Sequence, residues 1–328
     1  MLGPMTGRAR GILAKTLRVL GALLALLLVV VGVGVALTWA PDRPLDALVA
    51  RWAPPPSQFV EVKGMKVHLR DEGPRDDPAP IVLLHGTSAS LHTWEGWATA
   101  LRPTRRVIRF DLPGFGLTGP SPDGVYAIES YVAFVVAVLD HLHVQRCVIG
   151  GNSFGGHVSL AVTLAHPARV TRLILVDAAG YPSEVKSMPL GFRLARTPVL
   201  NRLASVSLPR RLIESSLRNV YGDPAKVTPE LVDLYFALAV RAGNRKALVA
   251  RFEQAPSGPL AARFGEIRVP TLVLWGGRDR LIPPSHAARF EKDIAGSKVV
   301  VFEDLGHVPQ EEGPDRTVSA VQAFLSSN

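Results

Sequence analysis

A run of glycines interrupted by a single serine constrains the fold of this chain more than any other segment. Residues 150–156 read GGNSFGG; they follow the apolar residues 147–149, typical of the end of a buried strand, and precede a segment with helical apolar spacing at 157–162. Glycine fits backbone positions where a side chain would collide. The segment therefore predicts a strand-to-helix turn too tight for side chains two positions before and after Ser153.

Such a turn holds the Ser153 hydroxyl clear of the backbone. The following helix directs its N-terminal N–H groups at the place where an oxyanion would form. We interpret residues 151–155, which fit G-x-S-x-G, as a nucleophile elbow. A phosphate-binding loop is the competing interpretation, but it requires Lys followed by Ser or Thr where the chain has Gly156 and His157. The dinucleotide fingerprint G-x-G-x-x-G is also absent from this segment.

A serine hydroxyl at its ordinary pKa is a weak nucleophile, so it requires a base and an acid that orients the base. His307 lies just beyond the last predicted strand, and Asp279 follows an earlier strand, 28 residues before it. The order Ser153, Asp279, His307 is the one expected for a nucleophile on this kind of elbow. Asp177, which follows another predicted strand, is the alternative acid.

Stabilisation of a tetrahedral oxyanion requires two backbone N–H donors. Phe154, directly after the nucleophile, is expected to supply one. Thr87, in the loop after the apolar residues 81–84, is expected to supply the other, with His85 bracing that loop. This chemistry requires neither a metal nor an organic cofactor, so we expect none.

The N-terminal part of the chain contains a second clear signal. Residues 19–40 form a stretch of 22 residues without a charge. At about 1.5 Å per residue, a helix of that length spans a hydrocarbon core of about 30 Å. Residues 1–18 contain four basic residues and no acidic one, so we expect a signal anchor with 1–18 in the cytoplasm and the remaining chain on the extracytoplasmic side. A cleaved signal peptide, which would leave a secreted protein, is the alternative.

The rest of the chain divides by pattern. Five prolines within residues 41–56 predict a stiff linker. Short apolar strands alternate with helical patterns over 57–180 and 265–328, which predicts an α/β domain with a mostly parallel sheet and helices on both faces. Residues 181–264 contain helical patterns and no convincing strand, so we expect a helical cap over the carboxyl ends of the strands, where open α/β sheets bind ligands.

The net charge of +9 is unevenly distributed. Residues 181–264 contain 13 Lys and Arg against 6 Asp and Glu, and 1–18 contribute +4, which leaves −2 for the remaining residues. Neither basic segment shows the aromatic interleaving or the motifs of nucleic-acid binding, so no nucleic-acid partner is expected. The single cysteine, Cys147, excludes an intramolecular disulfide and is expected in the core. The oligomeric state is not predicted by any of these patterns.

Five motifs, in this order, resemble the α/β-hydrolase superfamily over residues 59–326. They are HG at 85–86, DLPGFG at 111–116, GNSFG at 151–155, WGGRD at 275–279 and GH at 306–307. The resemblance implies an α/β-hydrolase fold with an eight-stranded sheet and a triad of Ser153, Asp279 and His307. A serine nucleophile argues against haloalkane dehalogenases and epoxide hydrolases, which use aspartate.

Two branches of the superfamily are similar in outline. Membrane-anchored, monoacylglycerol-lipase-like enzymes have one N-terminal anchor before the same core, and this similarity implies hydrolysis of carboxylic esters of lipophilic small molecules. Hydrolases of ring-cleavage products have a similar outline, so carbon–carbon bond hydrolysis is the alternative. Those enzymes typically carry a tryptophan directly after the catalytic histidine, where this chain has Val308, and this difference disfavours that activity. A ligand-binding protein without catalysis is a further alternative, which the intact Ser-Asp-His pattern disfavours.

Overall fold

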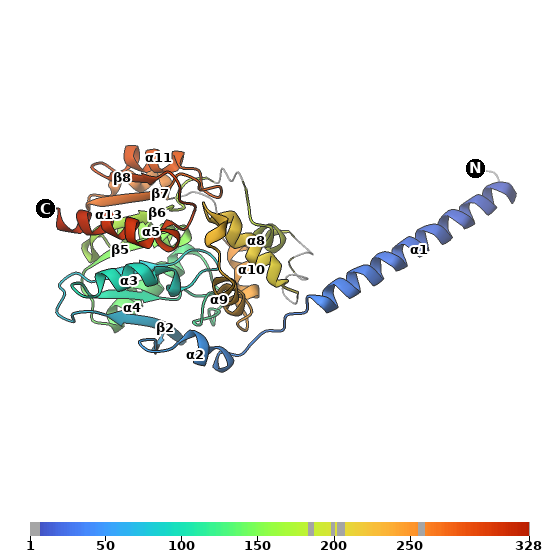
Figure 1. Cartoon of the computed structure of the whole chain (residues 1–328), viewed down its shortest axis with the longest axis horizontal. Coiled ribbons are helices and arrows are strands. Elements are labelled where there is room, and N and C mark those ends of the chain that lie inside the picture. Colours follow the sequence, from blue (N-terminus) through green and yellow to red (C-terminus); the bar gives the residue numbers. More distant parts are fainter. Residues whose placement is uncertain (1–6, 183–186, 198–200, 202–206, 255–259, 328) are drawn as a thin grey trace.

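The structure of this chain is a computed structural model, which describes residues 7–182, 187–197, 201, 207–254 and 260–327, with the backbone alone at residues 9, 10 and 12. An eight-stranded sheet forms its centre, in the order β1-β2-β4-β3-β5-β6-β7-β8 (Figure 1). The strands are β1 (Gln58–Val62), β2 (Met65–Glu72), β3 (Ile81–Leu84), β4 (Val107–Phe110), β5 (Cys147–Asn152), β6 (Val170–Val176), β7 (Thr271–Gly276) and β8 (Lys298–Phe302). β2 is antiparallel to both of its neighbours, and the other pairs are parallel. The expected mostly parallel eight-stranded sheet is confirmed.

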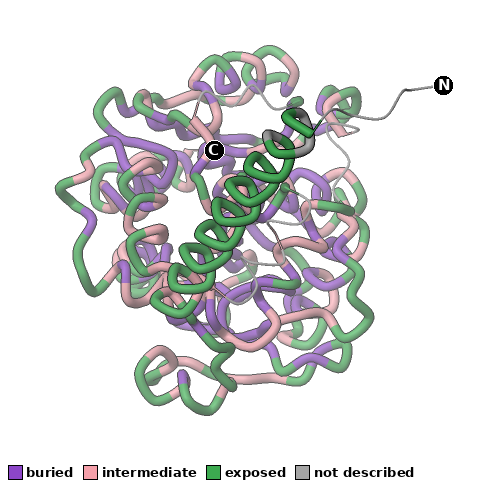
Figure 2. Tube along the Cα trace, turned by 90° about the vertical axis from the view of Figure 1, so that its right-hand side faces the viewer, coloured by how far each residue is buried: buried purple, intermediate pink, exposed green. Residues whose placement is uncertain are grey.

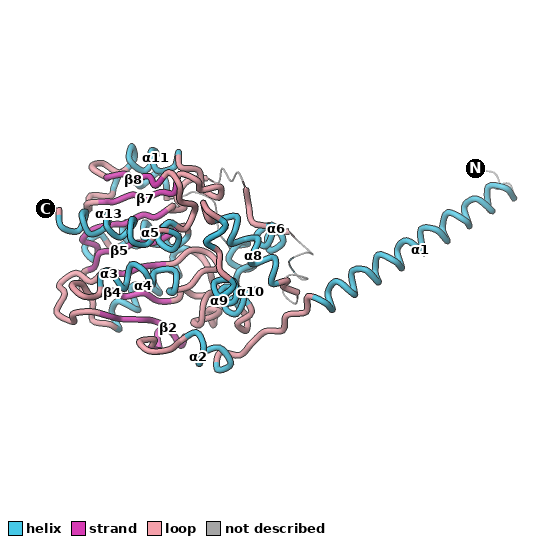
Figure 3. Tube along the Cα trace, in the orientation of Figure 1, coloured by secondary structure: helices cyan, strands magenta, loops and turns pink. Residues whose placement is uncertain are grey.

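Alternating apolar residues bury both faces of this sheet. In β3, Val82 and Leu84 belong to one core cluster, whereas Ile81 and Leu83 belong to another. The first cluster includes side chains of α4 (Ile128–His141), α5 (Phe154–Ala165) and α11 (Ser285–Asp293), and the second includes α3 (Glu95–Leu101) and α13 (Pro314–Ser326). Figure 3 shows helices on both faces, as a buried parallel sheet requires.

Helices α6 (Leu190–Arg196), α8 (Arg210–Val220), α9 (Pro229–Ala239) and α10 (Asn244–Gln254) lie between β6 and β7 in the sequence. Figure 1 shows α8, α9 and α10 beyond one end of the sheet, on the side from which α1 extends. No strand forms in the described part of residues 181–264. Residues 183–186, 198–200, 202–206 and 255–259 of the expected cap lie outside the described residues. We call the four helices the cap.

Helix α1 (Gly7–Leu37) precedes the domain and projects away from it (Figure 1). Its portion Leu13–Leu37 is long and apolar enough to cross a membrane, and Figure 2 shows its described residues exposed almost throughout. The helix ends three residues before the expected boundary at residue 40. Residues 1–6 of the expected basic segment lie outside the described residues.

Residues 41–56, expected to act as a stiff spacer, pack against the cap instead. The backbone of Arg43 pairs with the cap, because its N–H donates to Val240 O at 2.7 Å and its carbonyl accepts from Ala242 N at 2.8 Å. A short helix, α2 (Asp46–Trp52), follows, and Leu48 is buried in a cluster with Leu117, Ala237 and Leu238. The apolar residues between the prolines find partners that the local pattern does not reveal.

Candidate active site

The turn after β5 places Ser153 at the start of α5, as expected for an elbow. Ser153 has φ 53° and ψ −115°, a region that non-glycine residues rarely adopt. A side chain at Gly151 would place its Cβ 2.2 Å from the carbonyl carbon of Gly155. A Cβ at Gly155 would lie 2.2 Å from the carbonyl oxygen of Leu84 on β3. The two glycines are therefore required because the backbone of the elbow passes this close to itself and to β3.

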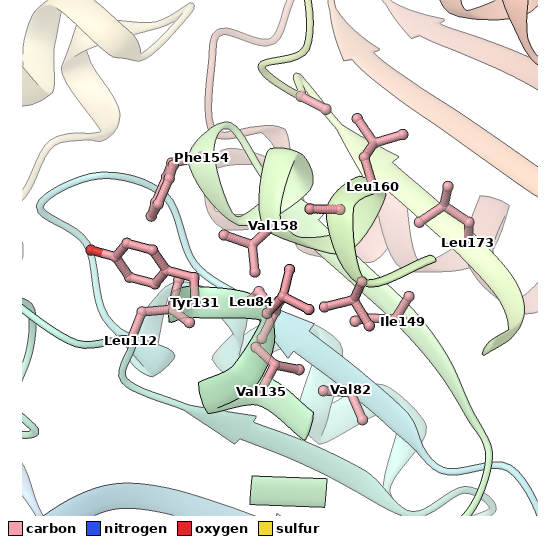
Figure 4. Close-up of a cluster of buried hydrophobic side chains, with 14 of the residues drawn as sticks. Val82, Leu84, Leu112, Tyr131, Val135, Ile149, Phe154, Val158, Leu160 and Leu173 are labelled. Atoms are coloured by element: carbon pink, nitrogen blue, oxygen red, sulfur yellow. The ribbon is translucent and has the colours of Figure 1, made fainter. Parts of the chain in front are cut away.

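Helix α5 is fixed by packing on the sheet and on α4. Figure 4 shows Val158 of α5 above Leu84 of β3, within the main core cluster. Phe154 packs its ring edge-to-face on Tyr131, with the ring centroids 4.9 Å apart. The N-terminus of α5, and with it the N–H of Phe154, is therefore held rigidly beside Ser153.

The structure brings His307 and Asp279 together, although they follow different strands. His307 Nδ1 lies 2.7 Å from Asp279 Oδ2, and both side chains are buried. The other carboxylate oxygen of Asp279 accepts from the N–H groups of Leu281 and Ile282, at 2.7 and 2.9 Å. With Nδ1 donating to Asp279, Nε2 of His307 carries no proton and can accept one, and His307 lines the same cavity as Ser153.

Asp177, the alternative acid, lies next to this pair but does not bond to His307. Its Oδ1 accepts from Gly276 N at 3.0 Å. Complete burial, and then the negative charge of Asp279, raise the pKa of Asp177 well above its ordinary value, which favours its neutral form. Asp177, Asp279 and His307 bring one ligand atom each within 4.8 Å of one another, the spacing of a metal site. His307 Nδ1 already bonds to Asp279, so this nitrogen is not free to bind a metal.

Asn152 is a residue that the pattern analysis did not single out. Its side-chain amide donates to Val176 O at 3.1 Å and to His307 O at 2.9 Å. It therefore joins the residue before the nucleophile to the backbone of the base. Only its place beside Ser153 in the motif could have pointed to it.

The two expected oxyanion donors lie on the same cavity wall. Gly86, Thr87 and Phe154 all line the cavity that contains Ser153. His85 braces the Thr87 loop as expected, since its Nε2 accepts from Leu112 N at 2.9 Å. Burial lowers the pKa of His85 and keeps this ring neutral. The Thr87 hydroxyl accepts from Nη2 of Arg251 on α10, at 2.9 Å, a contact across from the cap that no motif indicates.

The cavity has a volume of about 730 Å³ and is mostly apolar. Ser153 and His307 line it from the main body, and cap residues line it from α6, α8, α9 and α10. Four residues of the N-terminal segment also line it, namely Val31, Gly34, Val35 and Thr38. A cavity of this size and character holds a lipophilic small molecule.

The cap is bound to the histidine loop by buried polar contacts. The carboxylate of Glu311 accepts from the hydroxyls of Tyr221 and Tyr235, at 2.8 and 2.9 Å. Glu312 accepts from the N–H groups of Gly222 and Gly306, at 2.9 and 2.7 Å. Both carboxylates belong to α12 (Pro309–Glu312), directly after His307. The cap wall therefore has a fixed position relative to the base.

Comparisons with known proteins match this architecture. A family described as the alpha/beta hydrolase fold matches residues 79–314. A 2-hydroxy-6-oxo-2,4-heptadienoate hydrolase of Pseudomonas putida is 32% identical over 280 residues, which cover 82% of this chain and 96% of that protein.

Two solved structures are also similar. A meta-cleavage product hydrolase from Pseudomonas fluorescens IP01 superposes with a TM-score of 0.71 at 25% identity, covering 82% of this chain and 97% of that one. A membrane phospholipase A, described as a bacterial virulence factor, superposes with a TM-score of 0.71 at 26% identity, covering 94% of this chain and 97% of that one. With the family match and these relatives, the chain belongs to the α/β-hydrolase family and is a hydrolase.

Proposed function

We propose that this chain is a membrane-anchored serine hydrolase that cleaves carboxylic esters of lipophilic substrates. The observation that carries the proposal is the shared cavity, because Ser153 and His307 line the same apolar space as Val31 and Val35 of α1. If α1 lies in a bilayer, this space opens where lipid is present. A substrate with an apolar chain then reaches the serine without crossing water.

The reach of the structural match supports the same proposal. The match to the membrane phospholipase A leaves about 6% of this chain uncovered, which is fewer residues than the 1–57 that precede β1. That match must therefore extend into the N-terminal segment. The meta-cleavage product hydrolase covers 82% of the chain, about the length of the domain without that segment.

In the proposed mechanism, His307 removes the proton from Ser153 as its hydroxyl attacks the ester carbonyl. The N–H groups of Thr87 and Phe154 stabilise the oxyanion. His307 then protonates the leaving alcohol and activates the water that hydrolyses the acyl-enzyme. Asp279 orients the ring through Nδ1, and the raised pKa of Asp177 disfavours a second negative charge beside it.

Carbon–carbon bond hydrolysis of ring-cleavage products is the second candidate. The dienoate hydrolase and the meta-cleavage product hydrolase support this candidate more directly than the first, since their names state such substrates. Two features of this chain favour the ester reading instead: Val308 occupies the position of the tryptophan typical of those enzymes, and α1 lines the cavity.

The test uses the full chain in mixed micelles. Hydrolysis of p-nitrophenyl esters and monoacylglycerols, with acyl chains of four to sixteen carbons, is measured beside hydrolysis of 2-hydroxy-6-oxo-2,4-heptadienoate. We expect ester turnover that rises with chain length and disappears in Ser153→Ala, together with labelling of Ser153 by a fluorophosphonate. Faster turnover of the dienoate than of every ester would overturn the first candidate in favour of the second.

The membrane arrangement has its own test. The only native cysteine, Cys147, is buried, and burial raises the pKa of its thiol to about 12, so it does not react with maleimides. In intact cells, a membrane-impermeant maleimide is expected to label Glu61→Cys in the domain and to spare Arg8→Cys. The reverse pattern would place the domain in the cytoplasm, and a mature chain beginning near residue 41 would show that α1 is cleaved.

A further inference from the structure

We propose that the cavity contains an anion-binding subsite formed by Arg251, which takes a singly charged oxyanion group, a carboxylate or a phosphodiester, of the substrate or product. The inference rests on the proposed function, because the subsite lies in the cavity of Ser153. It goes beyond that function by adding a charged group to an otherwise lipophilic ligand.

Arg251 lies on the cavity-facing part of α10 and is 7% exposed. Its guanidinium carbon lies 4.3 Å from the ring centroid of Phe154 and 4.8 Å from that of Phe252. One nitrogen, Nη2, donates to Thr87 Oγ1, whereas Nε has no hydrogen-bond partner among the described residues. The group is thus buried, in contact with the two residues expected to supply the oxyanion donors, and incompletely satisfied.

Another arginine of the same cavity has the carboxylate partner that Arg251 lacks, although its Nε and Nη1 also have no hydrogen-bond partner among the described residues. Arg245, also on α10 and lining the cavity, donates to Asp42 Oδ1 at 2.6 Å and to Ala40 O at 2.7 Å. In the part of the chain that the structure describes, no carboxylate forms an ion pair with Arg251. A buried cation without a counterion is strongly unfavourable, so a native fold retains one where a partner arrives from outside.

A second cation, Arg196, adds positive charge to the part of the cavity that Arg251 lines. Arg196 of α6 lines the cavity, and its guanidinium carbon lies 4.5 Å from the ring centroid of Phe252, the ring that Arg251 also contacts. Burial, together with the charge of Arg196, lowers the pKa of Arg251 to about 10, so the group is protonated at neutral pH. An anion bound between the cap and Ser153 would offset both the cost of burying the Arg251 charge and its repulsion by Arg196.

The position of the subsite also limits the ligand. Because Arg251 bonds directly to Thr87, it lies beside the proposed oxyanion hole. The anionic group of a bound ligand would therefore lie within a few bonds of the scissile carbonyl. A fatty carboxylate product or an ester with a nearby carboxylate or phosphodiester meets this requirement, whereas a neutral triacylglycerol does not.

The test measures binding without turnover, in full-length Ser153→Ala protein in nonionic micelles. Titration calorimetry compares octanoate, octyl methyl phosphate and the neutral octanamide. We expect at least one anion to bind 10-fold or more tightly than octanamide, and this ratio to fall to about 1 when Arg251→Gln is added. The preferred anion identifies the source, a carboxylate or a phosphodiester. The exposed cap variant Arg211→Gln, which removes the same charge, is the matched control and is expected to keep the ratio.

Equal binding of the three probes, or a ratio that Arg251→Gln leaves unchanged, would overturn the subsite. If Arg251 has only a structural role, Arg251→Gln would weaken octanamide binding as much as anion binding and would also lower the melting temperature. That result would likewise overturn the subsite. If Arg251→Gln does not fold, Arg251→Lys replaces it and is expected to keep a reduced preference for the anion. Binding to the Ser153→Ala protein is measured without turnover. The subsite can therefore be confirmed or overturned whatever the result of the ester hydrolysis assay.

Discussion

The two walls of the cavity are built by different means. On the wall of the main body, backbone atoms set the geometry: Gly151 and Gly155 let the elbow approach β3, and a 2.7 Å bond orients His307. On the cap wall, long side chains such as Arg251 and the exposed end of α1 set the shape. The main-body wall is therefore fixed by close backbone contacts, whereas the shape of the cap wall depends on side-chain packing that a few substitutions can change.

The walls are nevertheless joined at one side. His307 N donates to Val220 O of the cap at 2.7 Å, and Glu311 and Glu312 accept from cap groups. A cap movement at this side would displace the base. Any opening for substrate is therefore expected at the other side of the cap, where the end of α1 contacts it.

Among these substitutions, Asp279→Asn in the main-body wall should have the largest effect, a loss of kcat. Asparagine keeps the shape but cannot hold His307 in the required tautomer, so kcat is expected to fall about 10⁴-fold. The measurement is ester turnover at saturating substrate. Asp177→Asn serves as the control, because the neutral Asp177 already resembles an amide, and its kcat should fall less than 10-fold. Equal losses in the two variants would show that both acids act on the base.

Leu48→Ala tests whether the N-terminal segment belongs to the cap wall. Leu48 is 1% exposed among Leu117, Ala237 and Leu238, so truncation should lower the free energy of unfolding by about 2–5 kcal/mol. Denaturant unfolding of the full chain in one detergent measures it. The half-buried neighbour Val49 lies on the same short helix, and Val49→Ala should cost less. If Leu48→Ala lowers the free energy of unfolding by less than Val49→Ala does, residues 41–56 act as a free spacer.

The pH dependence of stability sharpens the contrast between the two acids of the main-body wall. The pKa of Asp177 is raised from 3.8, so the folded state keeps a proton that the unfolded state releases above about pH 4. Its contribution to stability is present below that pH and falls as the pH rises towards the folded pKa, by at most about 1.4 kcal/mol per unit. Relative to the wild type, Asp177→Asn should become more stable as the pH rises above about 4. Parallel unfolding curves across that range would mean that Asp177 is ionised.

The smallest effect is expected where the two walls join, at Tyr235→Phe. The substitution removes one hydrogen bond to Glu311 and leaves the bond from Tyr221, so it should cost about 1–2 kcal/mol. Faster hydrogen exchange in α9 would measure it locally. Tyr181→Phe, which loses a bond to Asp293 outside the cap contact, should leave exchange in α9 unchanged. Loss of protection in both variants would point to global destabilisation instead.

Part of the candidate site could be predicted because its residues sit in local patterns. The elbow at 151–155 needs glycines for steric reasons, and Asp279 and His307 directly follow apolar strands, whose carboxyl ends share one edge of a parallel sheet. The tight turn between β1 and β2 is also a local feature, since Lys63 and Gly64 adopt the positive φ angles that it requires.

What the amino-acid sequence determined by itself is therefore the α/β fold, the order of the strands and helices, the apolar N-terminal helix and the candidate triad, because each follows from spacing within a short stretch. Only the tertiary structure decided that Arg251 reaches Thr87, that Asn152 bonds to the backbone of His307, that residues 41–56 pack on the cap and that α1 lines the cavity. These contacts join residues far apart in the chain. Local periodicity carries no information about them, because they depend on how the cap helices pack over the sheet.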